Sequence, residues 1–556
     1  MLLLWSAVVG AQQLSLSANG GSGQVAVPAG QPVGSSAEAP AFEQVLQGLT
    51  ERKFRVIEQA VTAVERSGDP RALSVLTAML ARQLYYTKGE KRLVIVVKRD
   101  GQRVVTDVVR GAVVSDLSPR QLKKVRLNNR LRRMLRAAIA RLNVFSEDRN
   151  TRLAAVEQMM DSMNAASEAV LRRAVTTETD DDIRDAMYTA LALADIHSPE
   201  KSARLRAVSV LSQSLHPAAR AALAGLVSPS GSGDAPDTDP EIRRAAQRAL
   251  QAIDARLQWY EFIETLFFGV SLGSVLLLAA IGLAITFGVM GVINMAHGEL
   301  IMLGAYTTFV VQEYLMPDYI DASLFVAVPL AFVVSALVGI LIERGVIRHL
   351  YGRPLDTLLA TFGISLILQQ TVRSIFSPLN QSVETPGWMS GSWEINSALS
   401  LTFNRLYIIV FSLLVFVALV ILLKKTVFGL QMRAVTQNRP MARAMGIRST
   451  WVDALTFGLG SGIAGVAGVA LSQLTNVGPN LGQSYIIDSF MVVVFGGVGN
   501  LWGTLVGAMS LGVVNKFLEP WSGAVLAKIL VLVFIILFIQ KRPRGLFPQR
   551  GRAAEN

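Results

Sequence analysis

The sequence predicts an all-α fold in two parts, a soluble helical domain followed by a polytopic membrane domain. Of the 556 residues, 51% are hydrophobic and only 17% are charged, a balance typical of membrane proteins. The charged residues are concentrated before residue 260, whereas long apolar runs fill the remainder. The chain therefore divides into two physically different halves.

Residues 1–11 have the composition of a signal peptide. They are apolar and end in Val9-Gly10-Ala11, the small-residue spacing that a signal peptidase accepts, although the usual basic start is missing. The run is too short to cross a bilayer. A short apolar terminus without a targeting role is the alternative. Residues 12–41, rich in Gly, Ser, Ala and Pro, predict a flexible spacer.

Residues 42–257 predict a helical domain that contains a small β-hairpin. Apolar residues recur at helical spacing from Phe42 to Leu84, and Gly68-Asp69-Pro70 breaks the run, so a helical hairpin is expected. Between Arg92 and Asp116, β-branched residues alternate around Asp100-Gly101, which is a strong hairpin signal.

An Arg- and Ala-rich motif then recurs in the same domain. It lies at residues 151–155, 183–186, 203–207 and 242–246, and three of its copies follow Asp or Pro residues suited to starting a helix. The pattern resembles HEAT-type repeats, in which each helix pair packs against its neighbours. Because the spacing is irregular, an ordinary helical bundle is the alternative.

Residues 258–548 predict the membrane domain, with about eight to ten spans. Seven apolar runs are each long enough to cross a bilayer; they cover residues 266–290, 299–316, 323–342, 357–376, 405–423, 451–473 and 524–540. The stretch 486–518 is longer than one span and is interrupted by glycines. We expect two short or discontinuous helices there, as found where backbone lines a transport cavity.

Lysine and arginine mark alternate connections between these runs. They gather between Arg344 and Arg353, between Lys424 and Arg448, and after Lys541. The other connections contain neither residue; they are 317–322, 377–404, 474–485 and 519–523. Positive loops remain in the cytoplasm. We therefore expect a multi-pass protein of the bacterial inner membrane, with residues 42–257 in the periplasm and the tail 549–556 in the cytoplasm.

Three segments resemble, in order, the permeases of ATP-driven importers for branched-chain amino acids and urea. They are GVINMAHGELIMLGAY at 291–306, GLQMRAVTQNRPMARAMGI at 429–447 and FGGVGNLWGTLVGA at 495–508. The resemblance covers about residues 262–548. It implies a second permease subunit, two cytoplasmic ATPase subunits and an extracytoplasmic substrate-binding protein. A large N-terminal extension resembles the urea branch, so urea is the expected substrate; a branched-chain amino acid or short amide is the alternative.

Several other classes of protein are disfavoured. The dipeptide Gly-Lys of a phosphate-binding loop is absent, so we expect partner subunits to use the ATP and this chain to bind no cofactor. Cysteine is absent too, and the four histidines do not have metal-ligand spacing. No catalytic constellation is visible, so we expect no enzyme. Basic residues alternate with acidic ones, which disfavours nucleic-acid binding. A membrane-anchored helical-repeat scaffold is the remaining alternative.

Two groups of residues are candidates for the substrate pathway. The first group lies between two apolar runs and consists of Asn294, His297 and Glu299. Ionisable groups at membrane depth are costly enough to indicate function. Capping of a re-entrant turn explains their presence equally well. The second is predicted to line the outer part of the path, with close helix packing by glycine as the alternative: Gly478, Pro479, Asp488, Gly496, Gly497 and Asn500.

The loop from Lys424 to Arg448 is a candidate for energy coupling. Its pattern predicts a short amphipathic helix that is too short to span the membrane and is rich in arginine. The resemblance implies that this is the coupling helix that docks into the ATPase, whereas positive-inside topology alone would explain only its charges. The candidate residues are Gly429, Arg433, Arg439, Pro440, Arg443 and Gly446.

Overall fold

The computed structural model describes residues 39–99, 102–114, 121–227 and 239–547. The predicted signal peptide, nearly all of the predicted spacer, the Asp100-Gly101 turn and the tail 549–556 lie outside these ranges. The chain divides into two compact units. The first comprises Met1–Leu211 with Ser228–Ala245, and the second comprises Ser212–Val227 with Ala246–Asn556.

The first unit begins with three short helices. They are α2 (Ala39–Gln47), α3 (Phe54–Arg66) and α4 (Ala72–Leu80), with the 3-10 turn η1 (Gly48–Thr50) after α2. The predicted break is confirmed, because α3 ends at Arg66 and Gly68 takes a φ of 67°, which glycine adopts without steric cost. Ile57, Val61 and Val64 on one face of α3 are fully buried in the core of this unit.

A four-stranded antiparallel sheet follows, in the order β3-β2-β1-β4. Its strands are β1 (Leu84–Thr87), β2 (Leu93–Arg99), β3 (Gln102–Asp107) and β4 (Leu122–Lys124). The predicted hairpin is confirmed as β2 and β3, which pair from Val94 opposite Asp107 to Arg99 opposite Gln102. The sequence pattern does not predict β1 and β4, because alternation cannot be recognised in strands of four and three residues.

Five helices complete the part of the first unit before Leu211. They are α5 (Asn129–Asn143), α6 (Arg149–Asp161), α7 (Ala165–Ala174), α8 (Asp181–Asp195) and α9 (Lys201–Leu211). Asp148 caps α6 by accepting from the Thr151 backbone N–H, and Asp180 caps α8 by accepting from Asp182 and Ile183. Each cap satisfies backbone donors that the helix leaves unpaired. Hydrogen bonds from the Thr151 side chain and backbone hold the pKa of Asp148 below its ordinary value.

Ion pairs connect α6 to the start of α8. Arg149 donates to Asp180 at 2.7 Å, and Arg152 donates to Glu178 at 2.9 Å. Burial alone would raise the pKa of Glu178, but the hydrogen bonds from Arg152 and from the backbone outweigh it, and the pKa is lowered. Glu178 therefore stabilises this unit in its ionised form, and that contribution is lost as the pH falls through its folded pKa. The HEAT-like character of these helices stays a prediction.

The second unit contains the membrane domain. After the short α10 (Pro217–Val227), its helices are α11 (Pro240–Met290), α12 (His297–Val310), α13 (Ile320–Gly345), α14 (Pro354–Phe376), α15 (Phe403–Lys425), α16 (Val427–Gln437), α17 (Arg439–Ala444), α18 (Ser449–Ser472), α19 (Leu481–Gly496) and α20 (Leu501–Lys541). Within the described residues, six helices are long and apolar enough to cross a membrane: α11, α13, α14, α15, α18 and α20. The polytopic all-α fold is confirmed.

The predicted interruption by glycines is also present. Helix α19 ends at Gly496, and Gly497 and Gly499 take φ values of 106° and 78° before α20 begins at Leu501. A second break lies inside α20, where Gly523 has φ 77° and ψ 159°. This break separates α20 into two apolar segments, as the connection at 519–523 without lysine or arginine predicts. A hairpin of β5 (Ser392–Asn396) and β6 (Leu399–Thr402) stands before α15 and is not predicted by the sequence.

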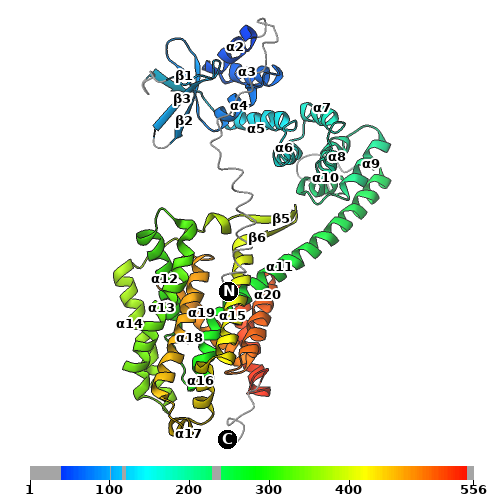
Figure 1. Ribbon diagram of the computed structural model, residues 1–556. Helices are drawn as coiled ribbons and strands as arrows, with labels where there is room; N and C mark the ends of the chain where they lie inside the picture. The colour runs from blue at the N-terminus through cyan, green and yellow to red at the C-terminus, as the bar shows by residue number, and fades with distance from the viewer. Residues whose placement is uncertain (1–38, 100–101, 115–120, 228–238, 548–556) are drawn as a thin grey trace. The chain divides into compact units, whose positions relative to one another are not determined.

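Helix α18 is the centre of the membrane domain and packs against α12 and α13 (Figure 1). Its glycines allow the neighbouring backbones to come very close. A Cβ at Gly465 would lie 2.5 Å from the carbonyl oxygen of Ala331, and one at Gly460 would lie 2.7 Å from that of Gly282. Small residues at helix contacts are the usual means of packing in membranes. Here they fix the positions of the helices that carry the polar residues described next.

Candidate functional site

Helix α14 buries a polar face and exposes an apolar one. Thr357, Thr361, Ser365 and Gln369 recur at every fourth residue, which places them on one side of the helix, and all four are buried. We call these four residues the polar seam. The outward side carries large apolar side chains, all exposed: Leu355, Leu359, Phe362, Leu366, Ile367 and Ile375. From Thr357 to Gln369 the seam extends about 18 Å along the helix.

Three other segments of the membrane domain contact the seam. Ser365 donates to the Glu299 carboxylate at 3.0 Å. The Gln369 amide donates to the Asn480 side-chain oxygen at 2.9 Å and to the Pro479 carbonyl at 3.3 Å. The Thr361 hydroxyl accepts from the Met295 backbone N–H at 3.2 Å. The seam is thus the common partner of the 291–296 connection, the first turn of α12 and the turn before α19.

Two helices begin beside the seam. Helix α19 has only 16 residues, fewer than a bilayer core requires, whereas the 14 residues of α12 continue directly into the π-helical segment η3 (Val311–Leu315). Their first turns meet, because a Cβ at Gly298 would lie only 2.6 Å from the carbonyl oxygen of Gly482. The first backbone N–H groups of a helix have no intrahelical partner, and here those of Glu299 and Leu481 donate to the carbonyl oxygens of Ala296 and Gly478 in the preceding turns. Discontinuous helices that start inside a membrane domain are typical of transporter binding sites.

Several buried polar atoms at this junction have no hydrogen-bond partner among the described residues. They are Nδ2 of Asn294, Nδ1 of His297 and Oε2 of Glu299. The opposite ring nitrogen of His297, Nε2, contacts the Ala279 carbonyl oxygen at 2.8 Å, and Oδ1 of Asn294 accepts from the Ala296 backbone N–H at 3.0 Å. A buried polar group without a partner is costly, and the Asn294 amide and the Glu299 carboxylate leave one donor and one acceptor of this kind at the junction.

The residues of the second predicted pathway group do not all lie in one place. Pro479 lies at the seam, and Gly478 beside it packs directly against the Asn380 side chain. Asp488 is buried in α19 and forms an ion pair with Lys528 at 3.0 Å, so its charge already has a partner.

The three remaining residues lie elsewhere. Gly496, Gly497 and Asn500 pack against the segment 542–547: Phe547 donates its backbone N–H to Gly496 at 3.1 Å, and the Asn500 amide donates to the Phe547 carbonyl at 3.3 Å. The structure therefore brings Pro479 and Glu299 to the same polar seam, through Gln369 and Ser365, but not Gly496, Gly497 or Asn500.

The predicted coupling loop folds as two short helices, α16 and α17. Thr426 caps α16 by accepting from the Gly429 backbone N–H at 3.2 Å, and Asn438 caps α17 by accepting from Met441 at 3.0 Å. Pro440 lies in the first turn of α17, where its missing N–H costs nothing. Gly446 follows the helix with a φ of 86°. The Gly-bounded helical pattern is therefore present, with a break at Asn438.

The three candidate arginines of this loop all have partners. Arg439 forms an ion pair with Asp453 at 3.0 Å, Arg443 donates to Ser449 at 2.7 Å, and Arg433 donates to the Leu423 carbonyl at 2.8 Å. They hold the loop against the ends of α15 and α18. Two methionines are the exposed apolar residues of the α17 segment, with Met441 60% exposed and Met445 77% exposed.

Comparison with known proteins agrees with this architecture. A family model described as branched-chain amino acid transport system / permease component matches residues 265–539. The high-affinity branched-chain amino acid transport permease LivH of Salmonella typhimurium is 32% identical over 298 residues, which is 52% of this chain and 96% of LivH. The chain belongs to this permease family. BraD of Pseudomonas aeruginosa is 30% identical over 295 residues, with 52% of this chain and 96% of BraD covered. No solved structure matches the chain.

Family membership establishes the general role. The permease is a multi-pass inner-membrane protein of an ABC-type importer and not an enzyme, and it works in a complex with ATPase subunits and a substrate-binding protein. Residues 1–264, which include most of the first unit, precede the region that the family model matches.

The sequence predicts Glu299 and Pro479 as pathway residues but not the polar seam that they contact. A usable signal was present, because the polar residues between 357 and 369 recur four apart in an otherwise apolar stretch. That run also has the lowest mean hydropathy of the six candidate spans, 1.3. The position of Asn480 opposite Gln369 could not be predicted, since 111 residues separate the two along the chain.

The seam should be reachable from water in the working importer. The permease contains no cysteine, so single cysteines can be labelled without background from this chain. We expect Ser365→Cys to react with a charged, water-soluble thiol reagent while ATP is being hydrolysed. Leu366→Cys, the next residue on the exposed apolar face, should not react, because the reagent does not enter lipid. Equal labelling of both cysteines, or labelling of Leu366→Cys alone, would show that the seam does not line the path.

Proposed function

We propose that this chain forms part of the translocation pathway of an ATP-driven importer for a small polar organic solute, with the polar seam and the first turns of α12 and α19 as the solute-contacting surface. The observation that carries the proposal is the inverted character of α14, which buries hydroxyl and amide groups and exposes leucine and isoleucine. A polar solute needs hydrogen-bonding partners along its route through a membrane, and the seam supplies them over about 18 Å.

A branched-chain amino acid is the first candidate substrate. The relatives named LivH and BraD are described as branched-chain amino acid permeases. The chemistry of the junction also suits a zwitterion. A substrate carboxylate is attracted to helix N-termini, and the Glu299 oxygen without a partner among the described residues is placed to accept from an ammonium group. The comparisons therefore favour this substrate over urea, which the sequence resemblance alone would place first.

Urea is the second candidate, supported by two separate observations. The matched region starts at residue 265, and a large N-terminal extension resembles the urea branch of these importers. The side chains of the seam and of Asn480 are themselves neutral hydroxyls and carboxamides, and the charged groups bonded to them are Glu299 and Arg373. Urea is neutral and carries four N–H donors and one carbonyl acceptor, so such groups can replace its hydration shell without any charge.

Uptake of labelled leucine and labelled urea distinguishes the two candidates. Cells lacking the permease should lose uptake of one of them and keep the other, and the plasmid-borne gene should restore it. Loss of leucine uptake alone selects the amino-acid assignment, and loss of urea uptake alone selects urea. If both solutes were taken up at the wild-type rate without the permease, and purified complexes bound neither, both assignments would be wrong.

The α16–α17 loop is the proposed contact with the ATPase, and the rest of the topology follows from it. The loop is proposed to be cytoplasmic, which places the first unit in the periplasm by the alternation of charged connections. Its candidate arginines are engaged within the chain, so the proposed contact is made by exposed apolar side chains, in α17 those of Met441 and Met445. Ala442, by contrast, is 5% exposed and packs in the core, so substitutions there would test folding instead of docking.

Substitution of the two methionines tests this contact. Met441→Asp with Met445→Asp should abolish co-purification of the ATPase subunits, because two desolvated carboxylates at an interface are strongly unfavourable. Membrane insertion should be unchanged, since both side chains are exposed. Met441→Leu with Met445→Leu, the matched control, should retain the ATPase. If the ATPase subunits still co-purified with the variant that carries both aspartates, the loop would not be part of the interface.

A further inference from the structure

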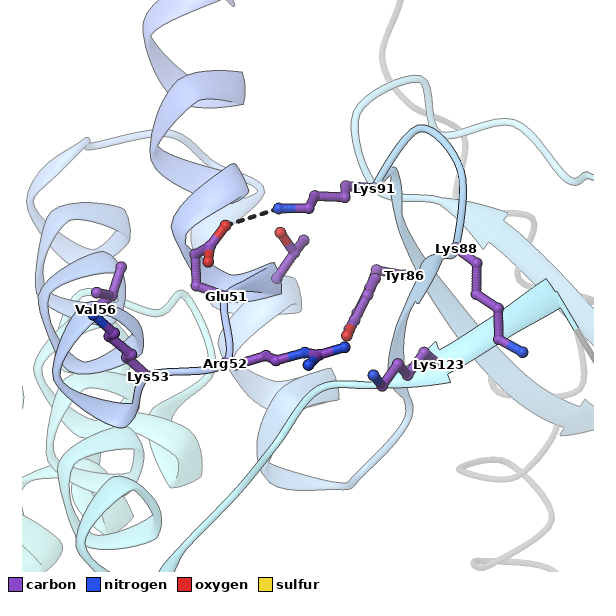
Figure 2. A pocket seen from close by; sticks show the side chains of 9 residues that line it. Glu51, Arg52, Lys53, Val56, Tyr86, Lys88, Lys91 and Lys123 are labelled. Carbon is purple, nitrogen blue, oxygen red and sulfur yellow. Dashed lines mark hydrogen bonds and ion pairs between the residues drawn. The ribbon is translucent and has the colours of Figure 1, made fainter.

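The first unit contains a pocket of about 700 Å³ that no family feature explains. It is formed where the segment after η1 approaches the start of β2 and the edge strand β4 (Figure 2). Its lining residues are Thr50, Glu51, Arg52, Lys53, Val56, Tyr86, Lys88, Lys91 and Lys123. Five of these nine side chains are cationic and one is a carboxylate.

The register of the sheet decides which cations face the pocket. Tyr86 pairs with Lys123, and Tyr85 pairs with Lys124, across the β1 and β4 strands. Because successive residues of a strand point to opposite faces, Tyr86 and Lys123 line the pocket together. Lys124 lies on the other face, with its ammonium 5.5 Å from the centre of the Tyr85 ring. Lys123 and Lys124 are therefore adjacent in the chain and both exposed, but they lie on opposite faces of the sheet.

The positive charge of the pocket is poorly compensated within the described residues. Lys91 forms an ion pair with Glu51 at 2.8 Å, drawn as the dashed line in Figure 2, and the hydrogen bond from Lys91 lowers the pKa of Glu51. The side chains of the four other cations form no ion pair or hydrogen bond in the described part of the chain; they are Arg52, Lys53, Lys88 and Lys123. Figure 2 shows the Arg52 side chain extending toward the hydroxyl end of Tyr86.

Such an arrangement has a specific physical consequence. Like charges gathered around one concavity repel each other, and the repulsion is relieved when an anion enters. Lysine ammonium groups bind phosphate-like anions as point charges, and a guanidinium adds a planar pair of donors. The hydroxyl groups of Tyr86 and Thr50 supply neutral hydrogen-bonding partners in the same lining.

We propose that this pocket binds an oxyanion carrying at least two negative charges, of the phosphate or phosphate-ester class. Arg52, Lys53, Lys88 and Lys123 neutralise the anion, and Tyr86 contacts it from the floor of the pocket. The phosphate can belong to a free small molecule or to the headgroup of an anionic lipid, since both present the same oxygens to the same cations. The site lies entirely within the first unit and is separate from the polar seam.

The test uses the full-length protein in nanodiscs of neutral lipid. Titration calorimetry with inorganic phosphate and inorganic pyrophosphate measures binding of a free anion. Co-sedimentation of the protein with vesicles that contain phosphatidic acid in place of neutral lipid measures binding of a lipid headgroup. Lys88→Ala with Lys123→Ala should weaken binding by about tenfold or more, and added salt should weaken binding to the unmodified protein. Lys124→Ala, which removes the same charge from the opposite face, should bind as tightly as the unmodified protein.

Each outcome decides the proposal. Binding of the inorganic anions assigns a free ligand, and binding of the vesicles alone assigns a lipid headgroup; either supports the site if the double variant loses it. An unchanged melting temperature of the double variant shows that it is folded. If none of the probes binds, or if the double variant and Lys124→Ala bind as tightly as each other, the pocket is not an oxyanion site.

Discussion

The membrane domain depends on one constraint, that a hydrogen-bonding group surrounded by hydrocarbon must find its partner within the protein. Helix α14 meets this constraint by turning its polar side inward, so that Ser365 and Gln369 bond to Glu299 and Asn480. Its leucines and isoleucines are left outside. The arrangement is the reverse of a soluble helix. It places Thr361, Ser365 and Gln369 where α12 and α19 begin.

Close backbone packing makes this interior possible. The glycines of α18, together with Gly298 and Gly482, allow helices to approach until almost no side chain separates them. Dispersion and exact fit hold helices together in lipid, where the hydrophobic effect gives no preference for helix over lipid. The same packing makes the domain sensitive to small changes. Because packed interfaces switch between discrete arrangements instead of deforming continuously, a movement delivered at the α16–α17 loop is suited to opening the junction between α12 and α19.

The sequence predicted the fold well and the site in part, for physical reasons that particular residues illustrate. The apolar runs locate the spans, because composition decides whether a segment enters a membrane, and the glycines at 496–499 mark the break after α19. Glu299 stands out since a carboxylate is conspicuous between apolar runs. The contact of Asn480 with Gln369 could not be predicted from the sequence, because it depends on how helices that are distant in the chain pack together. Asp488 was predicted as a pathway residue because a charge is unusual in an apolar segment. Its charge is neutralised by Lys528 from the last span, and only the folded structure shows that ion pair.

The central claim is that the polar seam contacts the transported solute, and transport by a variant of Gln369 tests it most directly. Gln369 and Gln370 are adjacent on α14, but Gln369 is buried at the seam and Gln370 is exposed. Reconstituted importers carrying Gln369→Leu should lose solute uptake by about tenfold, the effect of about 1.4 kcal/mol on the transport barrier, while the ATPase subunits stay bound. Gln370→Leu should transport normally. Equal uptake by the two variants at equal assembly would contradict the claim.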